Sequence, residues 1–172
     1  MRIAAPGCYA YVKEAQSGGE FAMSAYSHIL LATDGSEELE AIGEHARRLA
    51  HSFDARLSVL RVLDHLAFDF SYDPMLPDEA DKIQWFTESA QDSLRTFALH
   101  IGIDTAQTHV RVSPGPAQRE IISFAREHNV DLIVVGARER HGLAMFREDT
   151  MDKVAHNAPC DVLVVHVETR VP

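Results

Sequence analysis

The sequence has only two cysteines, and they form no recognisable motif. Cys8 and Cys160 lie far apart and match no C-x-x-C or mixed Cys/His spacing. This pattern provides neither a disulfide framework nor a zinc site of known spacing. We therefore expect a protein of the reducing cytoplasm.

Long apolar runs and an excess of positive charge are missing as well. No run approaches the roughly 18 to 20 apolar residues of a membrane helix, and the first residues lack the apolar stretch of a secretory signal. Asp and Glu number 26 against 16 for Lys and Arg, which gives a net charge of −10. Nucleic-acid-binding proteins carry the opposite sign. We expect no binding to membranes or nucleic acids.

The common motifs of phosphate binding and catalysis are also absent. No G-x-G-x-x-G follows the first apolar run, and there is no G-x-x-x-x-G-K-[ST]. The ten histidines include no H-E-x-x-H, Ser36 is not in a G-x-S-x-G turn, and the acidic stretch 69–81 lacks calcium-loop spacing. We expect no metal site and find little support for catalysis.

What the chain does contain fits one globular domain. A length of 172 residues with 46% hydrophobic residues is enough for a single core. Residues 1–22 are rich in Gly, Ser and small residues without a period, and a second methionine, Met23, follows. We predict that residues 1–22 are a disordered extension outside the fold and that the domain spans residues 23–172.

Short β-branched runs alternate with amphipathic helical stretches after Met23, a pattern typical of βαβ units and a mostly parallel sheet. The predicted class is therefore α/β, with an acidic loop at residues 64–81 after the second strand. The pattern predicts strands at 28–33, 56–63, 107–112, 132–136 and 162–167, and helices at 37–53, 83–101, 117–129 and 150–157.

Two loops are candidates for ligand binding. In an open parallel sheet the ligand crevice lies beyond the carboxyl ends of the strands, where the winding direction reverses. This rule selects residues 33–36 and 136–150. Asp34 could bond a ribose hydroxyl, coordinate a cation or merely cap the first helix, and the sequence leaves these roles open.

Three segments resemble the universal stress protein family. They are HILLATDGS with VLD at the end of the second strand, VDLIVVGARERHGL, and APCDVLVV, in this order along residues 26–168. The resemblance implies a Rossmann-like five-stranded parallel sheet in the order 3-2-1-4-5 with helices on both faces. It also implies a homodimer through the last strand, at Val162, Leu163, Val164 and Val165.

The resemblance further implies a site for AMP or for ATP with magnesium. Many members use the Asp after the first strand, backbone at the end of the second, and a G-x-x-G loop followed after nine residues by G-[ST]. The corresponding candidate binding residues of this chain are Thr33, Asp34, Val62, Gly136, Arg138, Gly142 and Thr150.

Two glycines of that motif are replaced here by carboxylates, Glu139 and Asp149. A side chain there blocks close approach of backbone amides to phosphate, and a carboxylate adds repulsion. Two charges about 4 Å apart interact by roughly 1 to 4 kcal/mol, or about one to three orders of magnitude in affinity. Arg138, Arg140 and Arg147 could offset this repulsion.

These observations leave three functions open. The first is a regulatory stress protein that acts through unknown protein partners and has weakened or lost ATP binding. The second is a sensor that still binds AMP or ATP, and the third is a slow nucleotide hydrolase or adenylyl-transfer enzyme.

Overall fold

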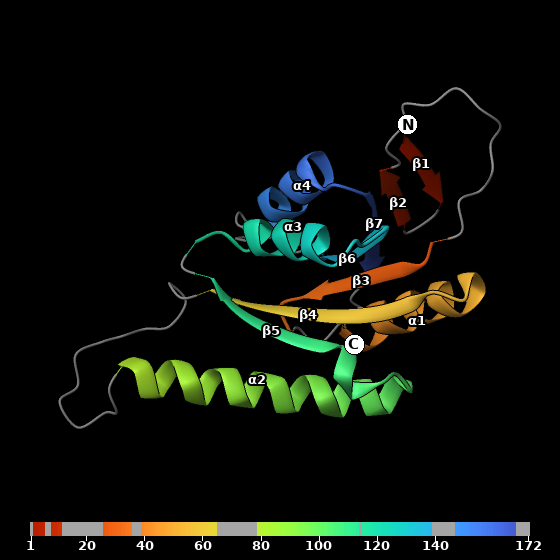
Figure 1. Cartoon of the computed structure of the whole chain (residues 1–172). Coiled ribbons are helices and arrows are strands. Elements are labelled where there is room, and N and C mark those ends of the chain that lie inside the picture. Colours follow the sequence, from red (N-terminus) through yellow and green to blue (C-terminus); the bar gives the residue numbers. More distant parts are fainter. Residues whose placement is uncertain are drawn as a thin grey trace, which may run out of the picture.

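The computed structural model describes residues 2–5, 8–11, 26–35, 39–64, 79–113, 115–138 and 147–167. Five parallel strands form its centre in the order β5-β4-β3-β6-β7 (Figure 1). When these five are numbered 1 to 5 along the chain from β3, the order is 3-2-1-4-5, as predicted. The strands are β3 (His28–Thr33), β4 (Arg56–Asp64), β5 (Thr108–Ser113), β6 (Leu132–Arg138) and β7 (Asp161–Val167).

Helices cover both faces of this sheet, as predicted (Figure 1). The helices are α1 (Leu39–Phe53), α2 (Glu79–Ile101), α3 (Ala117–Glu127) and α4 (Arg147–Asn157), with a short 3-10 helix η2 (Thr105–Gln107) before β5. Among the helices of the described residues, none combines the length and apolar character that crossing a lipid bilayer requires.

The core has two layers because successive side chains of a strand point to opposite faces. On β3, Leu30 and Ala32 pack with the helices α3 and α4, whereas Ile29 and Leu31 pack with α1 and α2. The run is apolar throughout because both of its faces are buried.

Several element boundaries differ from the predicted ones. Helix α2 begins at Glu79, inside the predicted acidic loop, of which residues 65–78 lie outside the described part. Strand β6 continues to Arg138 because it pairs with β7 as far as Val167. The end of α2 is as predicted, since Gly102 adopts a φ of +73° that suits a glycine cap.

The main departure from the predicted architecture is an amino-terminal hairpin. Strands β1 (Arg2–Ala5) and β2 (Cys8–Tyr11) pair with each other, and β2 runs antiparallel to β7 with Cys8 opposite Val165. These eight residues therefore extend the sheet to seven strands and do not lie outside the fold. Strands of four residues have too little periodicity to be recognised, and pairing with β7 supplies the partner that defines them.

Candidate functional site

Three strand ends meet at the carboxyl edge of the sheet. Strand β3 lies between β4 and β6, with Thr33 opposite Arg61 and Ala32 opposite Val135. One residue further along each strand brings Asp34, Val62 and Gly136 to the same edge. Four of the predicted site residues, counting Thr33, therefore converge as expected for a ligand crevice.

The turn after β3 has a defined local geometry. The backbone N–H of Gly35 donates to the Thr33 Oγ1 at 2.9 Å. Gly35 has a φ of +80°, in the left-handed region that glycine adopts without steric cost. Asp34 is exposed between these two residues. The turn therefore presents a carboxylate to solvent at the edge where a ligand would bind.

Arg61 lies directly beneath this turn and is the site residue that sequence analysis missed. An added Cβ on Gly35 would lie 2.6 Å from the Arg61 Cζ, so the guanidinium lies close against this glycine. Its Nε is buried and makes no hydrogen bond with the residues that the structure describes. The available signal was an arginine inside the apolar run RLSVLRVL, where a charge is unusual.

Gly136 has a packing role at the same edge. An added Cβ would collide with the Ile42 side chain of α1, because the helix lies close against β6 here. Val62 is half-buried and packs against the core formed with α3 and α4. Both residues shape the floor of the edge through apolar contacts.

The remaining predicted residues are only partly described. Arg138 ends β6 opposite Val167 in the backbone register, and Thr150 is half-buried in the first turns of α4. Gly142 and Glu139 lie outside the described residues, and for Asp149 the structure describes only its place in α4. The structure therefore leaves the effect of the two replacing carboxylates as a prediction.

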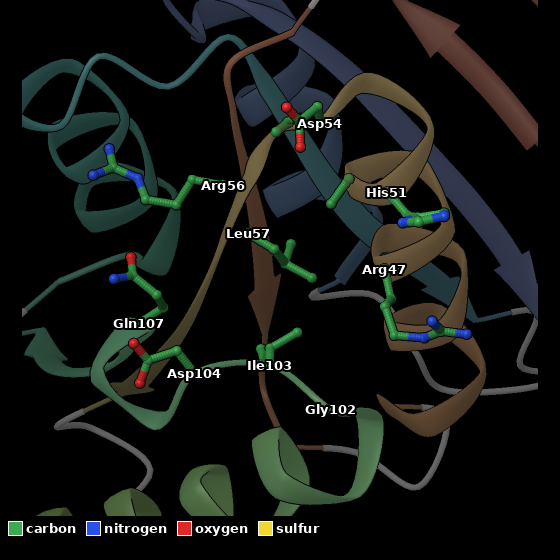
Figure 2. A pocket seen from close by; sticks show the side chains of 11 residues that line it. Arg47, His51, Asp54, Arg56, Leu57, Gly102, Ile103, Asp104 and Gln107 are labelled. Atoms are coloured by element: carbon green, nitrogen blue, oxygen red, sulfur yellow. The ribbon is translucent and has the colours of Figure 1, made fainter.

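A pocket lies at the opposite, amino edge of the sheet (Figure 2). It has a volume of about 490 Å³, an apolar floor that includes Leu57 and Ile103, and a charged rim. Figure 2 shows Arg47 and His51 on one side of Leu57, and Arg56 and Gln107 on the other. None of the predicted nucleotide-binding residues lines it. Within the described ranges no group of three or more His, Cys, Asp or Glu side chains could hold a metal ion.

Comparison with known proteins agrees with this geometry. The model of the universal stress protein family matches residues 25–166. The chain belongs to this family. Universal stress protein A homolog 2 of Coxiella burnetii is 32% identical over 150 residues, which cover 85% of this chain and 99% of that protein. Homolog 1 of the same organism is 29% identical over 81% of this chain and 96% of its own length.

Solved structures of family members have the same fold. The universal stress protein UspA of Lactobacillus plantarum superposes with a TM-score of 0.64 at 25% identity, over 83% of this chain and 99% of that one. A universal stress protein solved in complex with cAMP has a TM-score of 0.53 at 25% identity, over 84% and 100% of the two chains. An Archaeoglobus fulgidus member, solved in complex with dAMP, has 18% identity and a TM-score of 0.51 over 82% and 98%, and shows the fold alone.

Proposed function

We propose that this protein is a cytoplasmic regulatory member of its family that binds an adenine nucleotide at the carboxyl edge and holds ATP only weakly. The observation that carries the proposal is the convergence of Thr33, Asp34, Val62 and Gly136 on three adjacent strand ends. Asp34 would accept hydrogen bonds from ribose hydroxyls, and backbone beside Val62 would contact the nucleotide. The relative solved with cAMP supports this class of ligand.

Arg61 favours an anionic ligand over a neutral nucleoside. The residue is half-buried, its guanidinium lies close to Gly35 in the turn after β3, and its buried Nε has no hydrogen-bond acceptor among the described residues. A buried N–H without an acceptor is costly in free energy. A phosphate group nearby would reduce that cost, so Arg61 should increase affinity for nucleotides with few phosphates.

Glu139 and Asp149 are the reason for weak ATP binding in this proposal. They replace glycines whose backbone would approach the outer phosphates closely, and they add negative charge beside them. AMP and cAMP place less charge near these positions than ATP does. We therefore expect the order of affinity to be AMP above ATP.

Calorimetric titration with adenosine, AMP, cAMP and ATP tests the proposal. The double variant Glu139→Gly with Asp149→Gly should raise ATP affinity by about tenfold or more and leave adenosine affinity within about twofold. A second pair, Glu139→Gln with Asp149→Asn, removes the charge but keeps the side chains. Comparison of the two pairs separates electrostatic repulsion from backbone approach.

A matched control removes two exposed carboxylates far from the site. Glu88→Gln with Asp92→Asn on α2 changes the net charge by the same amount and should leave all four affinities unchanged. If the wild type binds ATP more tightly than AMP, the carboxylates do not block the phosphates. If it binds none of the four compounds, the nucleotide proposal itself is wrong.

We also propose a homodimer through the last strand, β7. In the structure of the single chain, β2 occupies the free edge of β7, with Ala10 opposite Leu163. Two β7 edges can therefore pair only when β2 moves away. Residues 8–11 and a second copy of the chain compete for one set of backbone hydrogen-bond groups.

Light scattering on the full chain tests this proposal. Ala10→Pro should weaken the pairing of β2 and increase the dimer fraction at micromolar concentration, because proline cannot donate a ladder hydrogen bond. Adding Val164→Lys on β7 should return the protein to a monomer. A monomer in both the wild type and Ala10→Pro would contradict the proposed dimer.

A further inference from the structure

A buried polar network surrounds His28 at the amino end of β3, away from the nucleotide edge. His28 is 3% exposed and Ser58 on β4 is 1% exposed. The His28 Nε2 lies 2.8 Å from the Ser58 Oγ, which donates to the Gln107 Oε1 at 3.2 Å. The other ring nitrogen, Nδ1, lies 2.7 Å from the Arg56 Nη2 and 3.0 Å from the His128 carbonyl oxygen.

The neighbours of the ring favour different positions of its proton. A guanidinium can only donate hydrogen bonds, so Arg56 bonds Nδ1 only in the tautomer in which that nitrogen carries no proton. The neutral ring then carries its proton on Nε2 and donates it to the Ser58 oxygen. Ser58 is free to donate its single hydroxyl proton to Gln107, as its distance to Gln107 requires.

The two contacts at Nδ1 exclude each other. The His128 carbonyl oxygen can only accept, so it bonds Nδ1 only when that nitrogen carries a proton. Arg56 can donate only when the same nitrogen carries none. Uptake of one proton from solvent therefore replaces the bond from Arg56 with a bond to His128. It also places two positive charges at a contact of 2.7 Å, which the guanidinium must leave.

Charged and titratable groups face His28 from each element packed against it. They are Arg56 on β4, His109 on β5, His128 after α3, and Asp131 before β6, whose Oδ2 accepts the His28 backbone N–H at 2.9 Å. Burial lowers the pKa of His28, and Arg56 and His128 lower it further, against the His128 carbonyl and Asp131. The ring is therefore neutral at pH 7, and its Nε2–H tautomer is the one to which Arg56 can donate.

We propose that His28 and Arg56 form a proton-controlled latch at the amino edge of the sheet. In the neutral state Arg56 is held on His28. In the protonated state His28 bonds the His128 carbonyl, and Arg56 is released at the rim of the pocket that it lines (Figure 2). Acidification therefore frees a positively charged side chain at this pocket to take a new position, independently of the nucleotide edge.

Nitrogen-15 NMR of the full chain across pH 4 to 8 tests the latch. At neutral pH the His28 ring should show the Nε2–H tautomer, and in acid both nitrogens should be protonated. The side-chain signals of Arg56 should shift with the same midpoint as the His28 ring. An Nδ1–H tautomer at neutral pH, or Arg56 signals that do not follow His28, would overturn the proposal.

Variants of the arginine separate the latch from general charge effects. Arg56→Gln should raise the proton affinity of His28 by about tenfold, because the opposing charge is gone. The midpoint of the His28 titration should then rise by about one pH unit. Arg56→Lys should keep the proton affinity of His28 within about threefold of the wild type, because the positive charge stays. This variant provides a second test if Arg56→Gln does not fold. Arg47→Gln is the matched control, since Arg47 lines the same pocket but pairs with Glu44 at 2.9 Å. Equal shifts in Arg47→Gln and Arg56→Gln would contradict the latch.

Discussion

The two edges of the parallel sheet differ in the hydrogen bonding and exposure of their polar groups. At the amino edge, Asp131 accepts the His28 backbone N–H, the His28 ring bonds Ser58, and Ser58 donates to Gln107. Each of these polar groups therefore has a partner in the chain. At the carboxyl edge, the buried Arg61 Nε has no acceptor among the described residues, and Asp34 lies in an exposed turn. The described polar groups of the amino edge are satisfied within the chain, whereas the carboxyl edge is the place where we propose that a nucleotide binds.

Asp131 shows what a complete edge requires. Its Oδ2 accepts the Ser27 backbone N–H at 2.8 Å, the Ser27 hydroxyl at 2.6 Å and the His28 N–H at 2.9 Å. Burial opposes ionisation of this carboxyl, but the hydrogen bonds from Ser27 and His28 outweigh it and lower its pKa. One side chain thus ties the start of β3 to the start of β6.

The largest effect on stability should come from removing that carboxylate. Asp131→Ala should lower the free energy of unfolding by about 3 kcal/mol, because it deprives three donors of a charged acceptor. Asp92→Ala, which breaks only an exposed pair with Arg95, should cost less than about 1 kcal/mol. Urea unfolding of the two variants measures the difference. Similar losses would mean that the network at the amino edge adds little to the stability of the fold.

A smaller loss is expected at the carboxyl edge from Gly136→Ala. The new methyl group collides with Ile42, and overpacking of this kind costs about 1 to 3 kcal/mol. Combining it with Ile42→Ala should recover part of the loss, in a double-mutant cycle read by thermal unfolding. A purely additive pair would show that the close approach of α1 to β6 is not the reason for the glycine.

Arg61→Gln should affect ligand binding more than stability. Removing a buried Nε–H that lacks an acceptor should leave the free energy of unfolding unchanged or raise it by up to about 1 kcal/mol, while AMP affinity falls by about tenfold. Adenosine affinity should stay within about twofold, and Arg61→Lys should keep part of the AMP affinity. Calorimetric titration decides between these outcomes. Equal losses for AMP and adenosine would show that Arg61 supports the turn at Gly35 and does not attract the phosphate.

The smallest effect should be the contribution of His28 to the pH dependence of stability. Its pKa is lowered from 6.5 in the folded chain, mainly by burial, so below pH 6.5 the unfolded chain binds more protons than the folded one. The stabilisation is complete above pH 6.5 and is lost as the pH falls through the folded pKa. Thermal melts from pH 5 to 8 should show a shallower decline for His28→Gln than for the wild type. Parallel curves would contradict this.

Local pattern in the sequence determined the main architecture of this protein. The apolar runs of β3 and β6 predict strands buried on both faces, and the spacing of Leu94, Phe97 and Ile101 predicts α2 with its glycine cap at Gly102. The general rule for parallel sheets selects the turn at Asp34 and the loop that begins at Gly136. The strand order and the place of Val62 came from the resemblance to the family.

Contacts between distant segments decided the rest. Strand β2 becomes a strand only because β7, more than 150 residues later, offers its edge. Arg61 joins the candidate site because Gly35 leaves room for its guanidinium. His28 becomes a buried titratable group because Arg56, Ser58 and His128 surround it. No local period encodes these arrangements. Hydrogen bonding and burial act on groups that only the folded chain brings together.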